Sequence, residues 1–209
     1  MRVTWFFDFI SPFSYFQCER LDRLPPGTEI DYRPVLLAGL LKHWQHKGPA
    51  EIPAKRRFTY RQSLWIARRE GIPFRAPPAH PFNPLSVLRL AIALGNEPGV
   101  VQTIFRFIWA EGHRTDEHAS WEALVSLLGI PDATDRIVSD EVKTTLRRNT
   151  EEAIALGVFG VPAIVAGREL FWGFDMTDMA AAYIEDSLAF EDAEMNRMGV
   201  LPIGVERPR

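Results

Sequence analysis

The sequence predicts an α/β fold in which a small unit of strands is interrupted by a long helical block. Three observations predict it. Residues 1–36 follow the order strand, helix, strand; the middle of the chain has helical periodicity; and after Gly157 the pattern returns to two short strands and a helix. The 209 residues suffice for one large domain, or for a small domain that carries a substantial insertion.

The opening unit begins with an apolar, aromatic run over residues 3–7, which is typical of a buried strand. A helix is expected over residues 12–24, followed by the breaker Pro25-Pro26-Gly27 and a second strand over residues 29–33. Because a strand–helix–strand crossover is right-handed and joins parallel strands, we expect these two strands to pair in parallel.

Ser11 and Pro12 mark the start of the first helix, as N-cap and first helical residue. This helix would begin at the carboxyl end of the first strand, where open α/β sheets place ligands. Its unpaired N–H groups and the positive end of its dipole stabilise an anion such as a thiolate. Ser11-x-x-Ser14 also has the spacing of a Cys-x-x-Cys redox motif, with hydroxyls in place of thiols. We therefore expect chemistry at this junction.

The middle of the chain is almost wholly helical in pattern, and Gly- and Pro-containing breakers separate its segments. The expected helices cover residues 36–46, 54–70, 84–94, 100–111, 119–128, 133–137 and 141–156.

The last part of the chain follows Gly157, a candidate helix C-cap. Strands are expected over residues 163–166 and 169–172, and a last helix over residues 177–190. This order of elements is that of a thioredoxin-like fold with a large all-helical insertion: strand–helix–strand first, then the helical block, then two strands and a helix. We expect residues 1–36 and 157–209 to form the thioredoxin-like domain and residues 37–156 the inserted helical domain.

The composition narrows the classes of function. A net charge of −3 gives no reason to expect nucleic-acid binding, although nine Lys or Arg residues face only two glutamates between Lys42 and Arg75. The single cysteine, Cys18, excludes an intrachain disulfide and a dithiol cycle, and we expect it to be buried and inert. The five histidines lack metal-ligand spacing, so no metal is expected. No secretory signal or membrane span is expected, and hence no membrane association. The expected location is the cytoplasm, with an organelle matrix as the alternative.

Five ordered motifs carry a resemblance to a known family. They are Asp8-Phe9-Ile10-Ser11-Pro12-Phe13-Ser14-Tyr15, the run from Pro49 to Arg57, Gly71-Ile72-Pro73-Phe74, Gly157-Val158-Phe159-Gly160-Val161-Pro162, and Leu170-Phe171-Trp172-Gly173-Phe174-Asp175. With them nearly the whole chain resembles the glutathione-dependent 2-hydroxychromene-2-carboxylate isomerases, neighbours of the kappa-class glutathione transferases and, more distantly, of DsbA. The resemblance implies glutathione as cofactor, a small aromatic substrate and a homodimer.

Within this family, Ser11 matches the serine that holds the sulfur of bound glutathione as a thiolate. The alternative is that Ser11 only caps the first helix. The resemblance also implies that the Val161-Pro162 bond is cis, which leaves the backbone of Val161 free to pair with glutathione as a peptide ligand.

Two residues match the family positions that hold the γ-glutamyl end. Asp175 corresponds to the receptor of its amino group, and from the residues alone it also reads as a helix N-cap. Phe174 stands where kappa-class chains tend to have a small hydroxyl residue, so only its backbone N–H is expected to remain as a contact.

Lys55 matches the lysine that reaches the glycyl end of glutathione. Lys55, Arg56 and Arg57 crowd the first turn of an expected helix, where cations are unfavourable by ~0.3 to 1 kcal/mol each, and this indicates a nearby anion. A solvated basic face, partly offset by Glu51, is the alternative. His46 stands where the family commonly has asparagine.

Further candidates concern the substrate. Arg33, at the end of the second strand, could hold a substrate carboxylate. Five aromatic residues at helical spacing are expected in the core or a subunit interface, and some of them in the wall of an apolar acceptor pocket: Phe58, Trp65, Phe105, Trp109 and Trp121.

The function expected from the resemblance is the isomerisation of an aromatic pyruvate-type compound, similar to conversion of 2-hydroxychromene-2-carboxylate to trans-o-hydroxybenzylidenepyruvate. A kappa-like glutathione transferase is the first alternative. A glutathione-binding module without turnover is the second, motivated by His46 and Phe174. A disulfide exchanger would need Cys18 to act alone.

Overall fold

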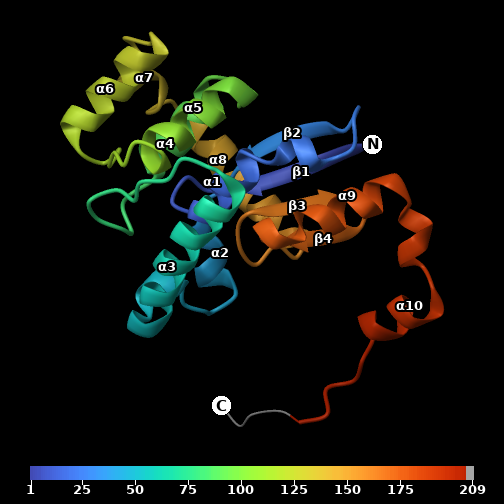
Figure 1. The fold of residues 1–209 in the computed structure, drawn as a ribbon. Helices are drawn as coiled ribbons and strands as arrows, with labels where there is room; N and C mark the ends of the chain where they lie inside the picture. The colour runs from blue at the N-terminus through green and yellow to red at the C-terminus, as the bar shows by residue number, and fades with distance from the viewer. Residues whose placement is uncertain (206–209) are drawn as a thin grey trace.

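A computed structural model describes residues 1–205 and places a four-stranded sheet between two helical layers (Figure 1). The strands are β1 (Arg2–Phe7), β2 (Glu29–Pro34), β3 (Ala163–Ala166) and β4 (Glu169–Trp172), in the order β2-β1-β3-β4. β1 and β2 are parallel, as predicted, whereas β3 runs antiparallel to β1 and β4 antiparallel to β3. The α/β class and the thioredoxin-like fold with helices between its two halves are confirmed.

Alternation along β1 divides its side chains between two cores. Trp5 and Phe7 are fully buried on one face, in the core that also holds residues of α1 (Pro12–Cys18), α5 (Pro98–Trp109) and α9 (Thr177–Glu185). This larger core passes without interruption from the sheet into the helical block.

Phe6 points to the opposite face, into a smaller core with residues of α2 (Leu37–His43) and α8 (Asp140–Ala155). Leu40 and Ala153 are the fully buried contributions of these two helices. α2 and α8 therefore cover the second face of the sheet, although both lie in the expected insertion. The division into domains stays a prediction.

The remaining elements complete the helical block and the end of the chain. The α-helices are α3 (Pro53–Glu70), α4 (Leu85–Ala93), α6 (His118–Leu128), α7 (Ala133–Arg136) and α10 (Ala193–Gly199), and the 3₁₀ helices are η1 (Leu21–Arg23), η2 (Pro49–Glu51), η3 (Phe174–Met176) and η4 (Ser187–Phe190). All seven helices predicted between residues 36 and 156 are present within three residues of the expected bounds. None of the helices between residues 1 and 205 is long and apolar enough to cross a membrane.

Two predicted helices are shorter than expected. The helix expected over residues 12–24 ends at Cys18, because Arg20 has a non-helical φ of −135° and its guanidinium turns to the carbonyl of Glu70; η1 follows. The helix expected over residues 177–190 ends at Glu185, because Asp186 is extended (φ −146°) and its Oδ1 accepts the Leu188 N–H at 3.1 Å, which starts η4. The sequence analysis did not predict α10.

Two of the aromatic residues of the helical block belong to the core. Phe105 packs at 4.6 Å from the Phe9 ring, and Trp109 Nε1 donates to the Phe9 carbonyl at 2.8 Å. Trp121 is half-buried, whereas Phe58 and Trp65 are exposed. Cys18 is buried as expected, and burial raises the pKa of its thiol.

Candidate active site

Ser11 lies at the carboxyl end of β1 and caps α1, as predicted. Its Oγ accepts the N–H of Ser14 at 3.2 Å, and its own N–H donates to the Asp8 carbonyl at 3.1 Å. The residue is only 6% exposed, but its Oγ accepts rather than donates in this cap, so the O–H remains available to donate. A donor at a helix N-terminus is suited to hold a negatively charged atom.

The strand register brings three predicted site segments to one edge of the sheet. Phe6 of β1 lies opposite Ala163 of β3, so Val161 and Pro162 come next to the end of β1 where Ser11 follows. Ala163 in turn lies opposite Trp172 of β4, so the residues after Trp172 reach the same edge. The Val161-Pro162 bond is cis, as expected.

Gln17 ties these segments together, and the sequence analysis missed it. Its Oε1 accepts the Trp5 indole N–H at 2.8 Å, and its Nε2 donates to the Gly173 carbonyl at 3.1 Å. The Gly173 N–H donates to the Pro162 carbonyl at 2.9 Å. α1 is thus linked through fully buried Gln17 to both of the other segments.

Phe174 and Asp175 follow Gly173, which has a φ of +104° that L-residues rarely adopt. The Phe174 side chain is buried against Phe16, so only its backbone can face a ligand. Asp175 is exposed and caps no helix: Met176 is the N-cap of α9 and makes no side-chain cap bond. The N-cap interpretation of Asp175 was wrong because η3 precedes α9.

His46 lies beside the loop that leads to Val161. Its Nε2 is 3.2 Å from the Phe159 carbonyl, and Trp44 Nε1 donates to the Val158 carbonyl at 2.9 Å. The end of α2 is therefore held against residues 157–161, and His46 comes close to the segment with the cis bond.

Exposed aromatic residues surround this loop, and the sequence analysis did not assign them. The rings of Phe159 and Trp172 meet edge to face at 4.9 Å, and the position of a Cβ on Gly160 would lie 2.7 Å from Trp172 Nε1. Trp44, Phe159 and Trp172 are all partly exposed. They offer an apolar surface next to the sheet edge, whereas Phe105 and Trp109 from the expected set are core residues.

Lys55 lies in the first turn of α3 and is exposed. Glu51 forms no ion pair with it, and the Glu51 Oε1 instead accepts the Gly48 N–H at 2.6 Å. Within residues 1–205 no carboxylate forms an ion pair with Lys55, Arg56 or Arg57. These cations at a helix N-terminus thus remain available to an anion.

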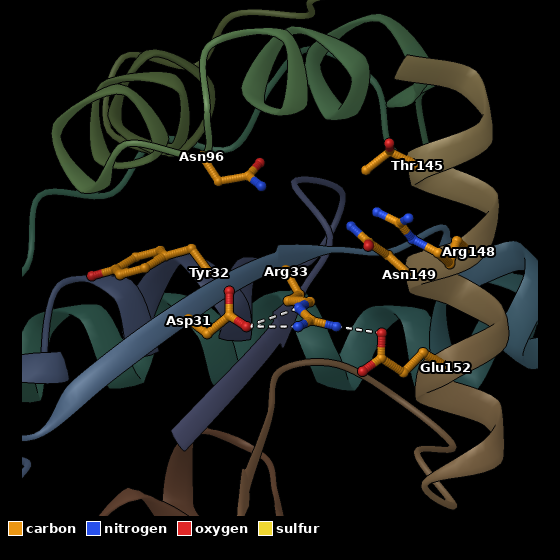
Figure 2. Close-up of a pocket in the computed structure, with 8 residues that line it drawn as sticks. All are labelled: Asp31, Tyr32, Arg33, Asn96, Thr145, Arg148, Asn149 and Glu152. Atoms are coloured by element: carbon orange, nitrogen blue, oxygen red, sulfur yellow. Dashed lines mark hydrogen bonds and ion pairs between the residues drawn. The ribbon is translucent and has the colours of Figure 1, made fainter. Parts of the chain in front are cut away.

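Arg33 does not belong to the group of residues around Ser11. It lies between the carboxylates of Asp31, at 2.8 Å, and Glu152, as Figure 2 shows. This trio lines a cavity of about 350 Å³ between β2 and α8, and none of the residues of 8–15 lines it. A guanidinium with two carboxylate partners has little capacity left for a substrate carboxylate.

Asp8 is a buried acid that the sequence analysis did not assign to the site. Its Oδ1 accepts the Ile10 N–H at 3.0 Å and its Oδ2 the Leu37 N–H at 2.8 Å. Burial raises the pKa of Asp8 to about 7, and the two backbone hydrogen bonds oppose this rise. Asp8 therefore joins the loop before Ser11 to the start of α2. Its place directly after a buried strand, at the start of the first family motif, was the signal in the sequence.

His80 supports the same loop from the helical block. Its Nε2 lies 2.8 Å from the Ile10 carbonyl and its Nδ1 2.8 Å from the Tyr60 hydroxyl. Burial lowers the pKa of His80, which favours the neutral ring with Nε2 as donor and Nδ1 as acceptor. The Pro-rich segment around His80 carries no periodic pattern, so no signal in the sequence predicted this contact. Within residues 1–205 no group of three or more His, Cys, Asp or Glu could hold a metal ion.

Ser14 provides a first prediction. Its side chain is fully buried and its Oγ has no hydrogen-bond partner. Ser14→Ala removes an unsatisfied polar atom, so we expect the free energy of unfolding to rise by ~1 kcal/mol, measured by urea denaturation. A loss of more than ~1 kcal/mol would show that the hydroxyl has a partner.

Comparisons with known proteins agree with the fold described above. Residues 2–185 match the family model of the DSBA-like thioredoxin domain. The chain is 32% identical over 176 residues to glutathione S-transferase kappa 2 of Caenorhabditis elegans, covering 77% of this chain and 78% of that protein. It is 32% identical over 184 residues to 2-hydroxychromene-2-carboxylate isomerase of Pseudomonas putida, covering 84% and 90%. Among solved structures, a 2-hydroxychromene-2-carboxylate isomerase superposes with a TM-score of 0.78 at 25% identity, covering 93% of this chain and 99% of that one.

Proposed function

Because this chain belongs to the DsbA-like thioredoxin domain family and has isomerases and glutathione transferases as relatives, we propose that it is a glutathione-dependent isomerase of an aromatic pyruvate-type compound. The reaction would resemble conversion of 2-hydroxychromene-2-carboxylate to trans-o-hydroxybenzylidenepyruvate. The observation that supports this most is the Ser11 hydroxyl, free to donate at the start of α1, on the sheet edge that also carries Val161-Pro162 and Asp175.

The residues of this edge fit the chemistry of glutathione. The tripeptide carries an ammonium group at its γ-glutamyl end, carboxylates at both ends and a thiol between them. Asp175 is an exposed acid for the ammonium, the N–H of Phe174 is a donor for the neighbouring carboxylate, and Lys55 is an exposed cation for the glycyl carboxylate. The backbone of Val161 would pair with the peptide, and His46 lies beside the same loop.

When bound, glutathione would supply a thiolate that adds to a conjugated double bond, allows rotation about the resulting single bond, and leaves again unconsumed. The part of the protein is to favour the charged sulfur and to hold the substrate. Ser11 donates its O–H and α1 contributes the positive end of its dipole, and both lower the pKa of a thiol placed there. Trp172 and Phe159 would cover an aromatic ring and exclude water.

The test is to mix purified protein, glutathione and 2-hydroxychromene-2-carboxylate, and to follow the substrate spectrum and the amount of free glutathione. We expect the spectrum to convert while free glutathione stays constant. No spectral change would contradict the proposal.

A kappa-like transferase is the second candidate, favoured by the similarity to glutathione S-transferase kappa 2. It would use the same residues but release a conjugate, so free glutathione would fall in step with product. Binding of glutathione in calorimetry, without turnover of any substrate in a panel, would favour a binding module instead. A homodimer and a cytoplasmic location also belong to the proposal.

Lys55 gives a second prediction. Lys55→Met removes the charge opposite the glycyl carboxylate, so we expect the KM for glutathione to rise about tenfold with kcat within about twofold, because the lost ion pair is made equally in ground and transition states. Steady-state kinetics with varied glutathione measures both constants.

Arg56→Met is the matched control, since Arg56 is an exposed basic neighbour in the same turn. Its KM for glutathione is expected to stay within about twofold of the original value. Equal effects of both substitutions would mean that the basic turn attracts glutathione only through its summed positive charge, and not through an ion pair with Lys55.

A further inference from the structure

α3 carries an exposed stripe of apolar and basic residues that nothing covers within residues 1–205. The stripe, here called the α3 stripe, consists of Ala54, Arg57, Phe58, Arg61, Gln62 and Trp65, at helical spacing. Phe58 is 66% and Trp65 58% exposed, and an open hollow of about 630 Å³ lies over them. All residues that line the hollow come from this one helix, so its opposite wall is missing.

The end of the described chain also has apolar side chains that nothing covers. Residues 186–205, here called the C-terminal arm, begin with η4, which packs against α9 with the Phe190 ring 5.5 Å from the Tyr183 ring. Beyond η4 the arm extends away from the body of the molecule, with α10 standing apart from the sheet and from α3 (Figure 1). Every residue from 191 to 205 is exposed, and α10 buries none of its side chains. The exposed large apolar residues of the arm are Leu188, Met195, Met198, Val200, Leu201, Ile203 and Val205. A seven-residue helix is not stable alone in water, so the arm needs a surface.

The charges of the two surfaces are opposite. α3 has six Lys or Arg residues and one glutamate, whereas the arm has four acidic residues and one arginine. Arg197 of the arm is already paired with Glu194, at 2.5 Å, and Arg69 of α3 with Glu70, at 2.7 Å. The remaining charges therefore present a basic stripe and an acidic arm, each with apolar side chains between the charges.

We propose that the C-terminal arm of one copy of this chain lies on the α3 stripe of a second copy. An exchange of arms between two copies is a reciprocal contact, which closes a two-fold dimer and leaves no stripe uncovered. Direct pairing of the two α3 stripes would instead place arginines against arginines, which is repulsive. Because Lys55 lies at the start of the same helix, the arm of the second copy would border the edge of the proposed glutathione site.

Cross-linking between copies tests the contact. Gln62→Cys places a thiol on the α3 stripe and Met195→Cys places one on the arm, while the native Cys18 is buried and gives little background. The two variants are mixed as full-length chains and treated with a flexible bis-maleimide. We expect a covalent heterodimer. Val138→Cys, an exposed apolar position on another part of the helical block, is the control and should not link to Met195→Cys.

Two outcomes would overturn the proposal. In a third variant, which carries both Gln62→Cys and Met195→Cys, a link formed only inside one chain would show that the arm folds back onto its own α3. No link at all, in variants with unchanged circular dichroism, would show that the arm does not reach the stripe. These results do not depend on glutathione or on activity, so they are independent of the proposed reaction.

A charge exchange provides a second readout. Arg57→Glu with Arg61→Glu should weaken the dimer at least about tenfold in sedimentation equilibrium, and adding Glu191→Lys with Glu194→Lys should restore at least part of the affinity. Weakening without any rescue would contradict the pairing of stripe and arm, as would a wild-type chain that is monomeric at all concentrations.

Discussion

Ser11→Ala is expected to reduce the turnover of the proposed isomerisation about 100-fold or more. The substitution removes the side-chain hydrogen-bond donor of the N-cap of α1, where the charged sulfur of glutathione would lie. Removal of a single donor that stabilises an anion in an enzyme costs about 10²- to 10³-fold in kcat. The backbone N–H groups of the helix remain, so some activity should persist. The rate of spectral conversion at saturating glutathione measures the loss.

Ser11 is also an N-cap, so the catalytic role must be separated from the capping role. Ser11→Ala loses the acceptor for the Ser14 N–H, which costs ~1 kcal/mol of stability. Ser11→Asp keeps an acceptor at this position and should keep most of that stability, yet its negative charge repels a thiolate. We expect Ser11→Asp to be folded and as inactive as Ser11→Ala.

Ser14→Ala is the matched control for activity, because Ser14 lies one turn along α1 and its buried hydroxyl makes no hydrogen bond. Its turnover should stay within about twofold of the wild type. The ultraviolet absorbance of the thiolate adds a direct readout: the pKa of bound glutathione should rise in Ser11→Ala and not in Ser14→Ala. Turnover of Ser11→Ala within threefold of the wild type would contradict the assignment.

The sequence predicted those parts of the fold and site that depend on local patterns. The Ser11-Pro12 start of α1, the strands Ala163–Ala166 and Glu169–Trp172, and the helices of the middle block all have capping, alternation or breaker signals within a few residues. The helix ends after Cys18 and Glu185 were placed too late. The first end depends on the tertiary contact of Arg20 with Glu70, and the second on the extended backbone of Asp186. Hydrophobic periodicity predicts neither feature.

The missing parts of the site depend on partners far apart in the sequence. Gln17 joins β1 to Gly173, 156 residues away, and His80 reaches the Ile10 carbonyl across 70 residues. Neither side chain has a local pattern that distinguishes it from a surface residue. Trp172 and Phe159 become neighbours only when β3 and β4 pair, so the sequence analysis did not predict the apolar surface that they form. It expected the wall of the acceptor pocket to come from aromatic residues of the helical block instead.

Asp8→Ala is expected to lower the free energy of unfolding by ~3 kcal/mol or more. Asp8 is fully buried, and its two oxygens accept the N–H groups of Ile10 and Leu37. Alanine leaves both donors without a partner, at a cost of ~1 to 3 kcal/mol each. Urea denaturation measures the change. Asp22→Ala, at an exposed acid, is the control and should change stability by less than ~0.5 kcal/mol. A similar effect of the two substitutions would mean that Asp8 does not hold the two loops together.

The pH dependence of stability tests the same residue through its proton. Burial raises the pKa of Asp8 to about 7 in the folded protein, whereas an unfolded aspartate has a pKa of ~3.9. The folded state therefore binds the proton more tightly, and the contribution of Asp8 to stability is complete below pH ~4 and is lost as the pH rises through about 7.

Other acids change the stability in the opposite direction. Arginine partners lower the pKa of Glu70 and Asp116, so the contribution of these two acids to the free energy of unfolding increases as the pH rises. The Asp8 effect must therefore be read as a difference between the wild type and Asp8→Asn, which keeps the shape but has no proton to lose. We expect the wild type to lose stability relative to Asp8→Asn between pH 4 and 7, with a slope of at most ~1.4 kcal/mol per pH unit. A flat difference would mean that the two backbone N–H bonds keep the carboxylate ionised throughout. In that case Asp8 would carry a fixed negative charge near Ser11. This charge would raise the pKa of a thiol placed there, against the lowering effect of the Ser11 hydroxyl and the dipole of α1.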